Sequence, residues 1–202
     1  MAENELRKVL TELNIPYYEA EGEAAFYGPK LDVQVKSAIG HDVTLSTCQL
    51  DFLLPERFEL EYVDEGGKKE RPVVIHRAIL GSLDRFIAFL LEETKGDLPT
   101  WLAPVQVKVI PVSSEHQGEY AKNIELYLKE NGIRVESDLR NEKLGYRLRE
   151  AQTAKIPYTL IIGDQEKEND TVSYRLHGQK ETTTVSKVEF LNLMKDIIDN
   201  KK

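Results

Sequence analysis

The sequence has little cysteine and histidine, and it has no long apolar run. A single cysteine, Cys48, among 202 residues cannot build an internal disulfide framework. No apolar stretch approaches the roughly 20 residues that a membrane-spanning helix needs, so no membrane partner is expected. The first residues, Met-Ala-Glu-Asn-Glu-Leu, lack the basic start and apolar core of a signal peptide. We therefore expect a cytoplasmic protein.

A basic charge balance is also missing. The chain has 27 lysines and arginines against 35 aspartates and glutamates, for a formal net charge of −8. Non-specific binders of nucleic acid need many phosphate contacts from Lys and Arg, and this composition counts against that class. It leaves open a specific RNA reader that concentrates a few arginines on one face.

The first half of the chain combines helical spacing with strand-like alternation. Apolar residues recur every three or four positions over 3–13, and they alternate with polar residues over 31–35. The further elements that the pattern indicates are strands at 43–52 and 72–80, a turn at 65–68 and a helix at 82–93. The β-branched run at 72–80 is typical of a buried strand. Together these elements predict an antiparallel sheet with helices.

Glycine and proline at residues 95–99 stop the preceding helix, and the periodicity restarts after them. We therefore expect one domain over residues 1–98 and a second over 99–202. The second half alternates between strands at 105–109, 133–136, 158–162 and 172–176 and helices that begin near Ser114, Asn141 and Ser186. This alternation predicts an α/β domain with a central sheet covered by helices.

Two helix starts and one helix face can be assigned in this half. Gln117 follows Ser114 by three residues and Glu189 follows Ser186 by three, so both pairs predict capping boxes. In the helix over 141–155 the residues expected to face inward are Leu144, Leu148 and Ala151, and those expected to face outward are Arg147, Arg149 and Lys155.

Several short stretches contain residue types that are found in functional sites, and each also has an ordinary structural interpretation. Gly28-Pro29 after Tyr27 is turn chemistry that leads into a strand. His76 closes an apolar run and is either a hydrogen-bonded structural residue or a ligand. The other histidines and Cys48 are scattered, so spacing alone indicates no zinc site.

Two later stretches leave the same choice open. Ser82 is either the N-cap of a helix or, with Arg85, part of an anion or nucleotide site, because free backbone N–H groups meet there. Residues 139–149 form a basic, polar helix start. They are either a solvated face or a surface for base recognition, since Asn and Arg can make bidentate bonds to the exposed base edges of single-stranded RNA.

Taken together and in order, these stretches resemble the bacterial threonyl-tRNA synthetases, which are class II aminoacyl-tRNA synthetases. The matching runs are residues 22–32, 46–52, 74–86, 99–104, 138–149 and 156–164. The resemblance covers nearly the whole chain. It implies an antiparallel fragment of the class II catalytic sheet, followed by an α/β anticodon-binding domain with a mixed central sheet.

The resemblance also implies an activity and its residues. The family's enzyme activates threonine with ATP, whose phosphates carry Mg, and transfers it to threonine tRNA. Carried over by position, the implied substrate-site residues are Tyr27, Lys30 and Gln49 near threonine and its adenylate, Ser82 and Arg85 in the third class II motif, and His76 as one zinc ligand. The implied anticodon-reading residues are Asn141, Arg149, Glu166 and Arg175. Zinc that binds the threonine hydroxyl would reject valine, which lacks it.

The sequence departs from the family pattern in two respects. Asp84 stands where the third motif usually has glutamate. The resemblance places the other two zinc ligands, the first two class II motifs and the editing domain upstream of residue 1. Because protein ligands supply most of zinc's affinity, we expect that this polypeptide alone does not activate threonine. The homodimer of the full-length family, which motif 1 commonly forms, stays open for this chain.

Three functions are therefore compared. The first is a part of an aminoacyl-tRNA synthetase that is inactive alone, the second is an anticodon-binding module without catalysis, and the third is a structural fragment. Threonine-dependent pyrophosphate exchange would support the first, and binding of the anticodon stem-loop without exchange would support the second.

Overall fold

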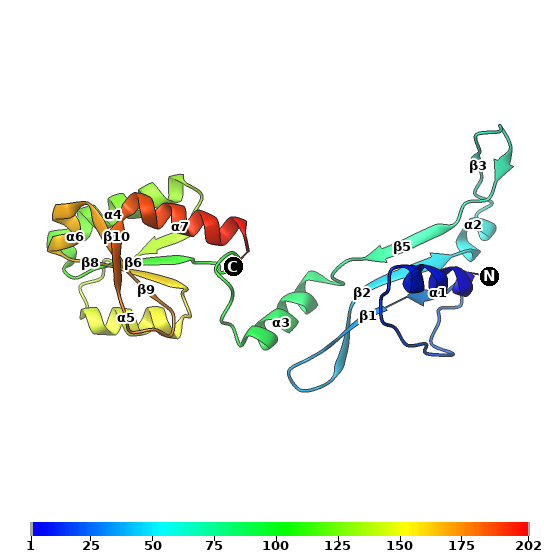
Figure 1. Ribbon diagram of the computed structural model, residues 1–202, viewed down its shortest axis with the longest axis horizontal. Coiled ribbons are helices and arrows are strands. Elements are labelled where there is room, and N and C mark those ends of the chain that lie inside the picture. The colour runs from blue at the N-terminus through cyan, green and yellow to red at the C-terminus, as the bar shows by residue number, and fades with distance from the viewer. Residues whose placement is uncertain (1, 202) are drawn as a thin grey trace. The chain divides into compact units, whose positions relative to one another are not determined.

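The computed structural model describes residues 2–201 and divides the chain into two compact units (Figure 1). The first unit ends at Glu93 and the second begins at Thr94. The domain boundary between residues 98 and 99 stays a prediction. None of the helices within residues 2–201 combines the length and the apolar composition that spanning a membrane requires.

The first unit is built on an antiparallel sheet, as the sequence predicts. Its elements are α1 (Ala2–Glu12), β1 (Lys30–Lys36), β2 (Asp42–Asp51), α2 (Leu53–Arg57), β3 (Tyr62–Val63), β4 (Lys69–Glu70), β5 (Val74–Ala78) and α3 (Leu83–Thr94). The strands β1, β2 and β5 lie in that order and pair antiparallel. The strands β3 and β4 form a separate hairpin, which projects from the end of the sheet (Figure 1). The patterns did not predict α2 or this hairpin.

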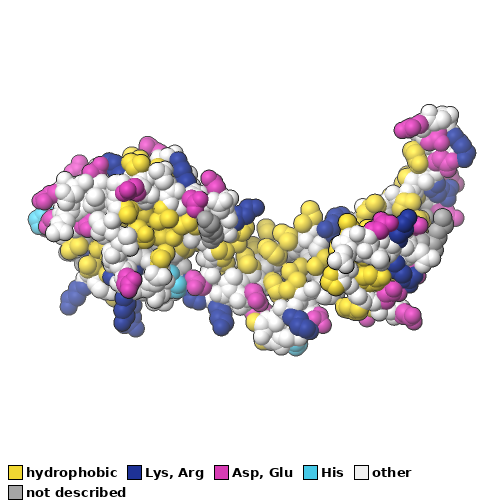
Figure 2. Space-filling view, in the orientation of Figure 1, with side chains coloured by type: hydrophobic (Ala, Val, Ile, Leu, Met, Phe, Trp, Pro, Cys, Tyr) yellow, Lys and Arg dark blue, Asp and Glu magenta, His cyan; other side chains and the backbone are white. Residues whose placement is uncertain are grey.

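The apolar side chains of the first unit are largely at the surface. Within residues 3–93, Leu10 and Pro55 are the buried apolar residues, and α3 has none. Ile75 on β5 is 61% exposed, so the prediction that this strand is buried is wrong. Figure 2 shows hydrophobic side chains spread over the visible face of this unit. A β-branched run predicts a strand, but burial also requires a covering element.

The second unit contains a five-stranded mixed sheet, which confirms the expected α/β class. Its elements are β6 (Val107–Pro111), α4 (Ser114–Glu130), β7 (Val135–Ser137), α5 (Leu144–Thr153), β8 (Tyr158–Ile162), α6 (Asp164–Asn169), β9 (Thr171–Leu176), β10 (Thr183–Ser186) and α7 (Lys187–Asp199). The strand order is β10-β9-β8-β6-β7. β6 runs parallel to β7 and β8, whereas β9 is antiparallel to β8 and β10.

Helices cover both faces of this sheet, and the hydrophobic core lies between them. α4 and α7 lie on one face and α5 lies on the other (Figure 1). Because β6 lies between β8 and β7 and is covered on both faces, Val109 and Ile110 are both fully buried although they point to opposite faces. The larger cluster centres on the α4 and α7 face, where Phe190 packs against Tyr158.

Some helix details differ from the sequence prediction. The capping box of Ser186 and Glu189 is confirmed. At α4 the N-cap is Ser113 instead of Ser114, and the Oε1 atom of Gln117 accepts a hydrogen bond from the Ser113 backbone N–H at 2.8 Å. The helix therefore starts one residue earlier than the capping-box spacing suggests.

The face of α5 was also assigned incorrectly at one position. Arg147 was expected to point outward, but it is only 2% exposed. Its guanidinium donates hydrogen bonds to the backbone carbonyls of Asp138 at 2.9 Å and Pro111 at 2.8 Å. These carbonyl oxygens replace the water that a buried cation would otherwise need.

Candidate functional site

Three of the predicted substrate-site residues form one row across the sheet of the first unit. Lys30 on β1 pairs with Gln49 on β2, which pairs with His76 on β5. Directly paired residues on neighbouring strands point to the same face. The Tyr27 hydroxyl donates a hydrogen bond to Gln49 Oε1 at 2.9 Å, and its ring lies 5.9 Å from the His76 ring, centroid to centroid. The structure therefore brings these four residues together.

Gly28 allows Tyr27 to lie this close to β2. Its φ is +154°, and a Cβ atom there would lie 2.0 Å from the carbonyl oxygen of Leu50. The backbone on both sides is hydrogen-bonded to β2, with Leu50 N–H donating to Pro29 and Phe52 N–H donating to Tyr27. The Gly28-Pro29 turn thus has a structural role that also places a site residue.

Asp51 is a residue of this site that the sequence reasoning missed. Its carboxylate is fully buried and lies 2.8 Å from His76 Nε2, and it accepts bonds from the Leu53 and Leu54 backbone N–H groups. Burial acts to raise the pKa of Asp51, but these hydrogen bonds outweigh it and lower the pKa below its usual value. A signal was present, because Asp51 follows Gln49 by two residues on one strand and shares its face.

Lys30 forms an ion pair with Asp32, which lies beside the row of Lys30, Gln49 and His76. Its Nζ lies 2.6 Å from Asp32 Oδ2, and this bond raises the pKa of Lys30. Burial acts to raise the pKa of Asp32, but hydrogen bonds from Lys30 and Thr47 lower it overall. Both groups therefore stay ionised near neutral pH, and the lysine can hold an anionic group.

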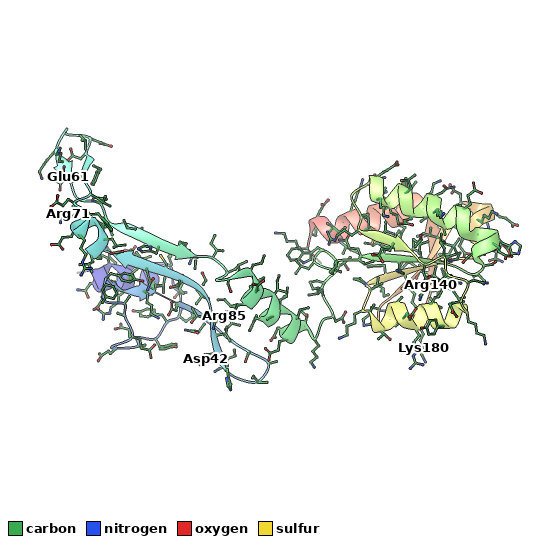
Figure 3. The ribbon with its side chains drawn as sticks, turned by 180° about the vertical axis from the view of Figure 1, so that it is seen from behind. Asp42, Glu61, Arg71, Arg85, Arg140 and Lys180 are labelled. Atoms are coloured by element: carbon green, nitrogen blue, oxygen red, sulfur yellow. The ribbon has the colours of Figure 1, made fainter. Side chains whose placement is uncertain are left out.

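A cavity of about 240 Å³ opens beside His76 and Tyr27. Its lining residues are Phe26, Tyr27, Asp51, Leu53, Leu54, Arg57 and His76. Ser82 and Arg85 do not line it, and both are exposed. Figure 3 shows Arg85 projecting from the start of α3. Of the four predicted residues that the sheet brings together, Tyr27 and His76 line this cavity, whereas Lys30 and Gln49 do not.

His76, the predicted zinc ligand, is not accompanied by enough further metal ligands. Among residues 2–201, no group of three His, Cys, Asp or Glu side chains could hold a metal ion. His76 instead pairs with Asp51. Since zinc sites in proteins have at least three protein ligands, the described residues do not form a zinc site by themselves.

In the second unit, one predicted anticodon-reading residue, Glu166, contacts Ser173 on the strand that also carries another, Arg175. The Glu166 carboxylate of α6 accepts hydrogen bonds from Gly163 N–H at 2.8 Å and from the Ser173 hydroxyl of β9 at 2.6 Å. Arg175 follows Ser173 by two residues, so both side chains stand on one face of the sheet. This face therefore carries a carboxylate and a guanidinium.

The other two predicted residues are exposed, one before α5 and one in the middle of this helix. Asn141 lies in the loop before α5 and Arg149 lies on α5. Within residues 2–201, no direct hydrogen bond or ion pair joins any two of these four residues. Next to Asn141, Arg140 binds Asp138 at 2.6 Å and also pairs with Glu150 (Figure 3 labels Arg140).

Asp138 gives this loop a testable pH dependence. The Arg140 guanidinium and backbone N–H hold the pKa of this buried carboxyl below its usual value of 3.8. A depressed folded-state pKa stabilises the fold above the unfolded value, and this stabilisation is lost as the pH falls through the folded-state value. Asp138→Asn should therefore destabilise the second unit at pH 7, and the difference from wild type should shrink below about pH 4.

Urea unfolding followed by the fluorescence of Trp101, the single tryptophan, measures this effect in the second unit. Asp199→Asn, an exposed change on α7, serves as the control and should match wild type at both pH values. A difference for Asp138→Asn that is the same at pH 7 and pH 3 would contradict the assigned ionisation.

Comparison with known proteins assigns a family to each unit. The family model of the "tRNA synthetase class II core domain (G, H, P, S and T)" matches residues 2–94, and the "Anticodon binding domain" model matches residues 106–197. The threonine–tRNA ligase of Oceanobacillus iheyensis is 58% identical over 98% of this chain, and that of Geobacillus kaustophilus is 58% identical over all of it. The chain spans about 30% of the length of these curated relatives.

Solved structures give the same assignment. The RNA-binding domain of the threonyl-tRNA synthetase from Cryptosporidium parvum matches 97% of this chain with a TM-score of 0.89 and 36% identity, and the match covers 50% of that chain. A threonyl-tRNA synthetase from Aeropyrum pernix matches 98% of it with a TM-score of 0.77 and 30% identity, over 49% of that chain. The chain therefore belongs to the threonyl-tRNA synthetase family, with part of the class II core in its first unit and an anticodon-binding domain in its second.

Proposed function

We propose that this chain takes part in the ATP-dependent joining of threonine to threonine tRNA in the cytoplasm. The residues proposed to read the anticodon are Asn141, Arg149, Glu166 and Arg175. Those proposed for the pocket of threonine and ATP are Tyr27, Lys30, Gln49, Ser82 and Arg85, with His76 as one zinc ligand. Such catalysis depends on positioning and electrostatic stabilisation, so no side chain needs to act as a nucleophile.

The observation that carries the RNA-reading part is the state of Arg175. Its side chain is half-buried on the sheet face, and its buried Nε atom has no hydrogen-bond partner within residues 2–201. Its one described side-chain contact is with the Thr182 hydroxyl at 3.5 Å. The Nε atom itself is enclosed, but the guanidinium makes only one long bond at its exposed end, and a base of single-stranded RNA offers acceptors for its terminal NH groups.

The test is binding of a threonine-tRNA anticodon stem-loop, measured by fluorescence anisotropy. Arg149→Ala and Arg175→Ala should each weaken binding by roughly 1–3 kcal/mol, because each removes a base contact. Lys122→Ala removes an exposed charge from α4, on the opposite face of the sheet, and should change affinity little. Unchanged affinity in both arginine variants would refute the assignment. The same chain should show no threonine-dependent pyrophosphate exchange.

A binding module without catalysis is the second candidate, and the distribution of the core favours it. The buried hydrophobic clusters lie in the second unit, whereas the first unit exposes most of its apolar side chains. A non-hydrolysable threonyl-adenylate analogue separates the two functions. Perturbation of the Tyr27 and His76 NMR signals supports the ligase part, and RNA binding without any such perturbation supports the module.

A further inference from the structure

A chain of hydroxyl groups supports the Glu166 carboxylate from two strands. The Ser173 hydroxyl on β9 lies 2.6 Å from Glu166 Oε1, and the Thr184 hydroxyl on β10 lies 2.6 Å from the Ser173 hydroxyl. Gly163 N–H donates to the other carboxylate oxygen, Oε2, at 2.8 Å. Glu166 is therefore held by a backbone group on one side and by a side-chain relay on the other.

The direction of the hydrogen bonds in this relay follows from the number of protons. A hydroxyl has one proton to donate, and an ionised carboxylate only accepts. Ser173 therefore gives its proton to Glu166, and Thr184 gives its proton to Ser173. Because Ser173 is only 6% exposed, water has little access to replace it. The rotamer of Glu166 therefore depends on Ser173, which belongs to none of the sequence motifs described above.

The carboxylate keeps acceptor capacity for a ligand. Two oxygens offer about four lone-pair sites, and Gly163 and Ser173 occupy one on each oxygen. At the ring nitrogen of the Watson–Crick edge, guanine and uracil carry an imino N–H that can donate to this acceptor, whereas adenine and cytosine carry an acceptor nitrogen there and donate only from their exocyclic amino groups. Threonine codons begin with adenine and cytosine, so their anticodons end in guanine and uracil.

We propose that Ser173 is a positioning residue that fixes Glu166 to accept the imino N–H of one of these two anticodon bases. The inference rests on the proposed anticodon-reading function and deepens it. Ser173 does not touch the RNA itself, because its proton is committed to Glu166. It sets the base preference by holding the acceptor on the sheet face that also carries the donor Arg175.

A double-mutant cycle tests this coupling in the whole chain. Ser173→Ala, Glu166→Gln and the double variant are each titrated with three stem-loops: the native loop, one with the guanine changed to adenine, and one with the uracil changed to cytosine. We expect Ser173→Ala to weaken binding of the native loop roughly tenfold, since it frees a charged acceptor to rotate. The altered loop that lacks the base contacted by Glu166 should bind wild type and Ser173→Ala with the same affinity. In the Glu166→Gln background, Ser173→Ala should not lower the affinity any further.

Two variants separate positioning from folding. Ser173→Thr keeps the hydroxyl and should restore the preference for the native loop. Thr171→Ala, two residues earlier on the same face of β9, removes a hydroxyl outside the relay and should leave the preference intact. Unfolding followed by Trp101 fluorescence confirms that each variant is folded.

Three results are decisive. If Ser173→Ala weakens all three loops equally, or weakens binding equally in the Glu166→Gln background, Ser173 does not position Glu166. If Glu166→Gln loses the preference while Ser173→Ala keeps it, the inference fails but the proposed function stands. If the wild-type chain binds all three loops alike, the anticodon-reading function itself is wrong and this inference falls with it.

Discussion

Arg147→Ala is expected to lower the free energy of unfolding of the second unit by about 3–5 kcal/mol, because it strips a buried cation from the carbonyl groups that surround it. The guanidinium donates to Asp138 and Pro111 and, at 3.3 Å, to Val112. These carbonyls belong to two separate segments, at residues 111–112 and at residue 138, and both precede α5 in the sequence. Removing the side chain leaves them without their donor and also opens a cavity.

Urea unfolding followed by Trp101 fluorescence gives the number, and Arg149→Ala is the matched control. Arg149 is the same residue type two positions away on the same helix, but it is exposed. Its substitution should change stability by no more than about 0.5 kcal/mol. Arg147→Met keeps most of the volume, so the part of the loss that remains in this variant measures the hydrogen bonds.

In RNA binding the order of the two effects should be reversed, with the larger loss of affinity in Arg149→Ala. Arg149→Ala weakens the anticodon stem-loop complex while the fold stays intact, whereas Arg147→Ala weakens binding only as far as it unfolds the unit. Equal and small stability losses in both variants would show that the Arg147 guanidinium is not buried in solution.

Arg147 also shows where sequence interpretation went wrong in this helix. Arg147 was predicted to face outward, although it stands three residues after Leu144 and four before Ala151, at positions that share one helix face. The residue type argued for the outside, because arginine is seldom buried. The carbonyls that make its burial possible come from distant segments, and no local pattern shows that they converge.

The sequence predicted the three strands β1, β2 and β5 of the first unit, but it did not predict how their residues pair. Counting back from the turn, Lys36 pairs with Asp42 and Gln34 pairs with Thr44, which would place Lys30 opposite Cys48. A bulge next to Val33 shifts the pairing by one residue, and Lys30 faces Gln49 instead. A shift of one residue moves every side chain to the other face, so this bulge makes the row with His76 possible.

The site residues themselves came from resemblance more than from pattern. His76 had an ordinary structural interpretation when considered alone, and Arg175 was named only because its position matches one in the family. Asp51 lies within the matching run 46–52, but the resemblance implied no role for it, and Ser173 lies outside the matching runs, so both were missed. Each matters through a contact across strands or between strand and helix, with His76 in one case and Glu166 in the other.

Gly28→Ala is the other substitution with a large expected effect. A Cβ atom 2.0 Å from the Leu50 carbonyl oxygen cannot be accommodated without moving the backbone, because both atoms belong to the main chain or are fixed to it. We expect the segment before β1 to leave β2, at a cost of about 2–4 kcal/mol. The Tyr27 hydroxyl would then lose Gln49, and the cavity beside His76 would lose one wall.

Amide hydrogen exchange measures this locally, because the Leu50 and Phe52 amides are bonded to the carbonyls on either side of Gly28. Both should exchange roughly a hundredfold faster in Gly28→Ala. Gly22→Ala is the matched control, since Gly22 has a φ of +81° but nothing within 4 Å of an added Cβ. It pays only for the positive φ, about 1–2 kcal/mol, and leaves those two amides protected. If the Leu50 and Phe52 amides exchange equally fast in both variants, glycine is needed at position 28 for its positive φ and not for the close approach of the backbone to the Leu50 carbonyl. In that case Tyr27 does not depend on the contact between Gly28 and Leu50 for its place in the site.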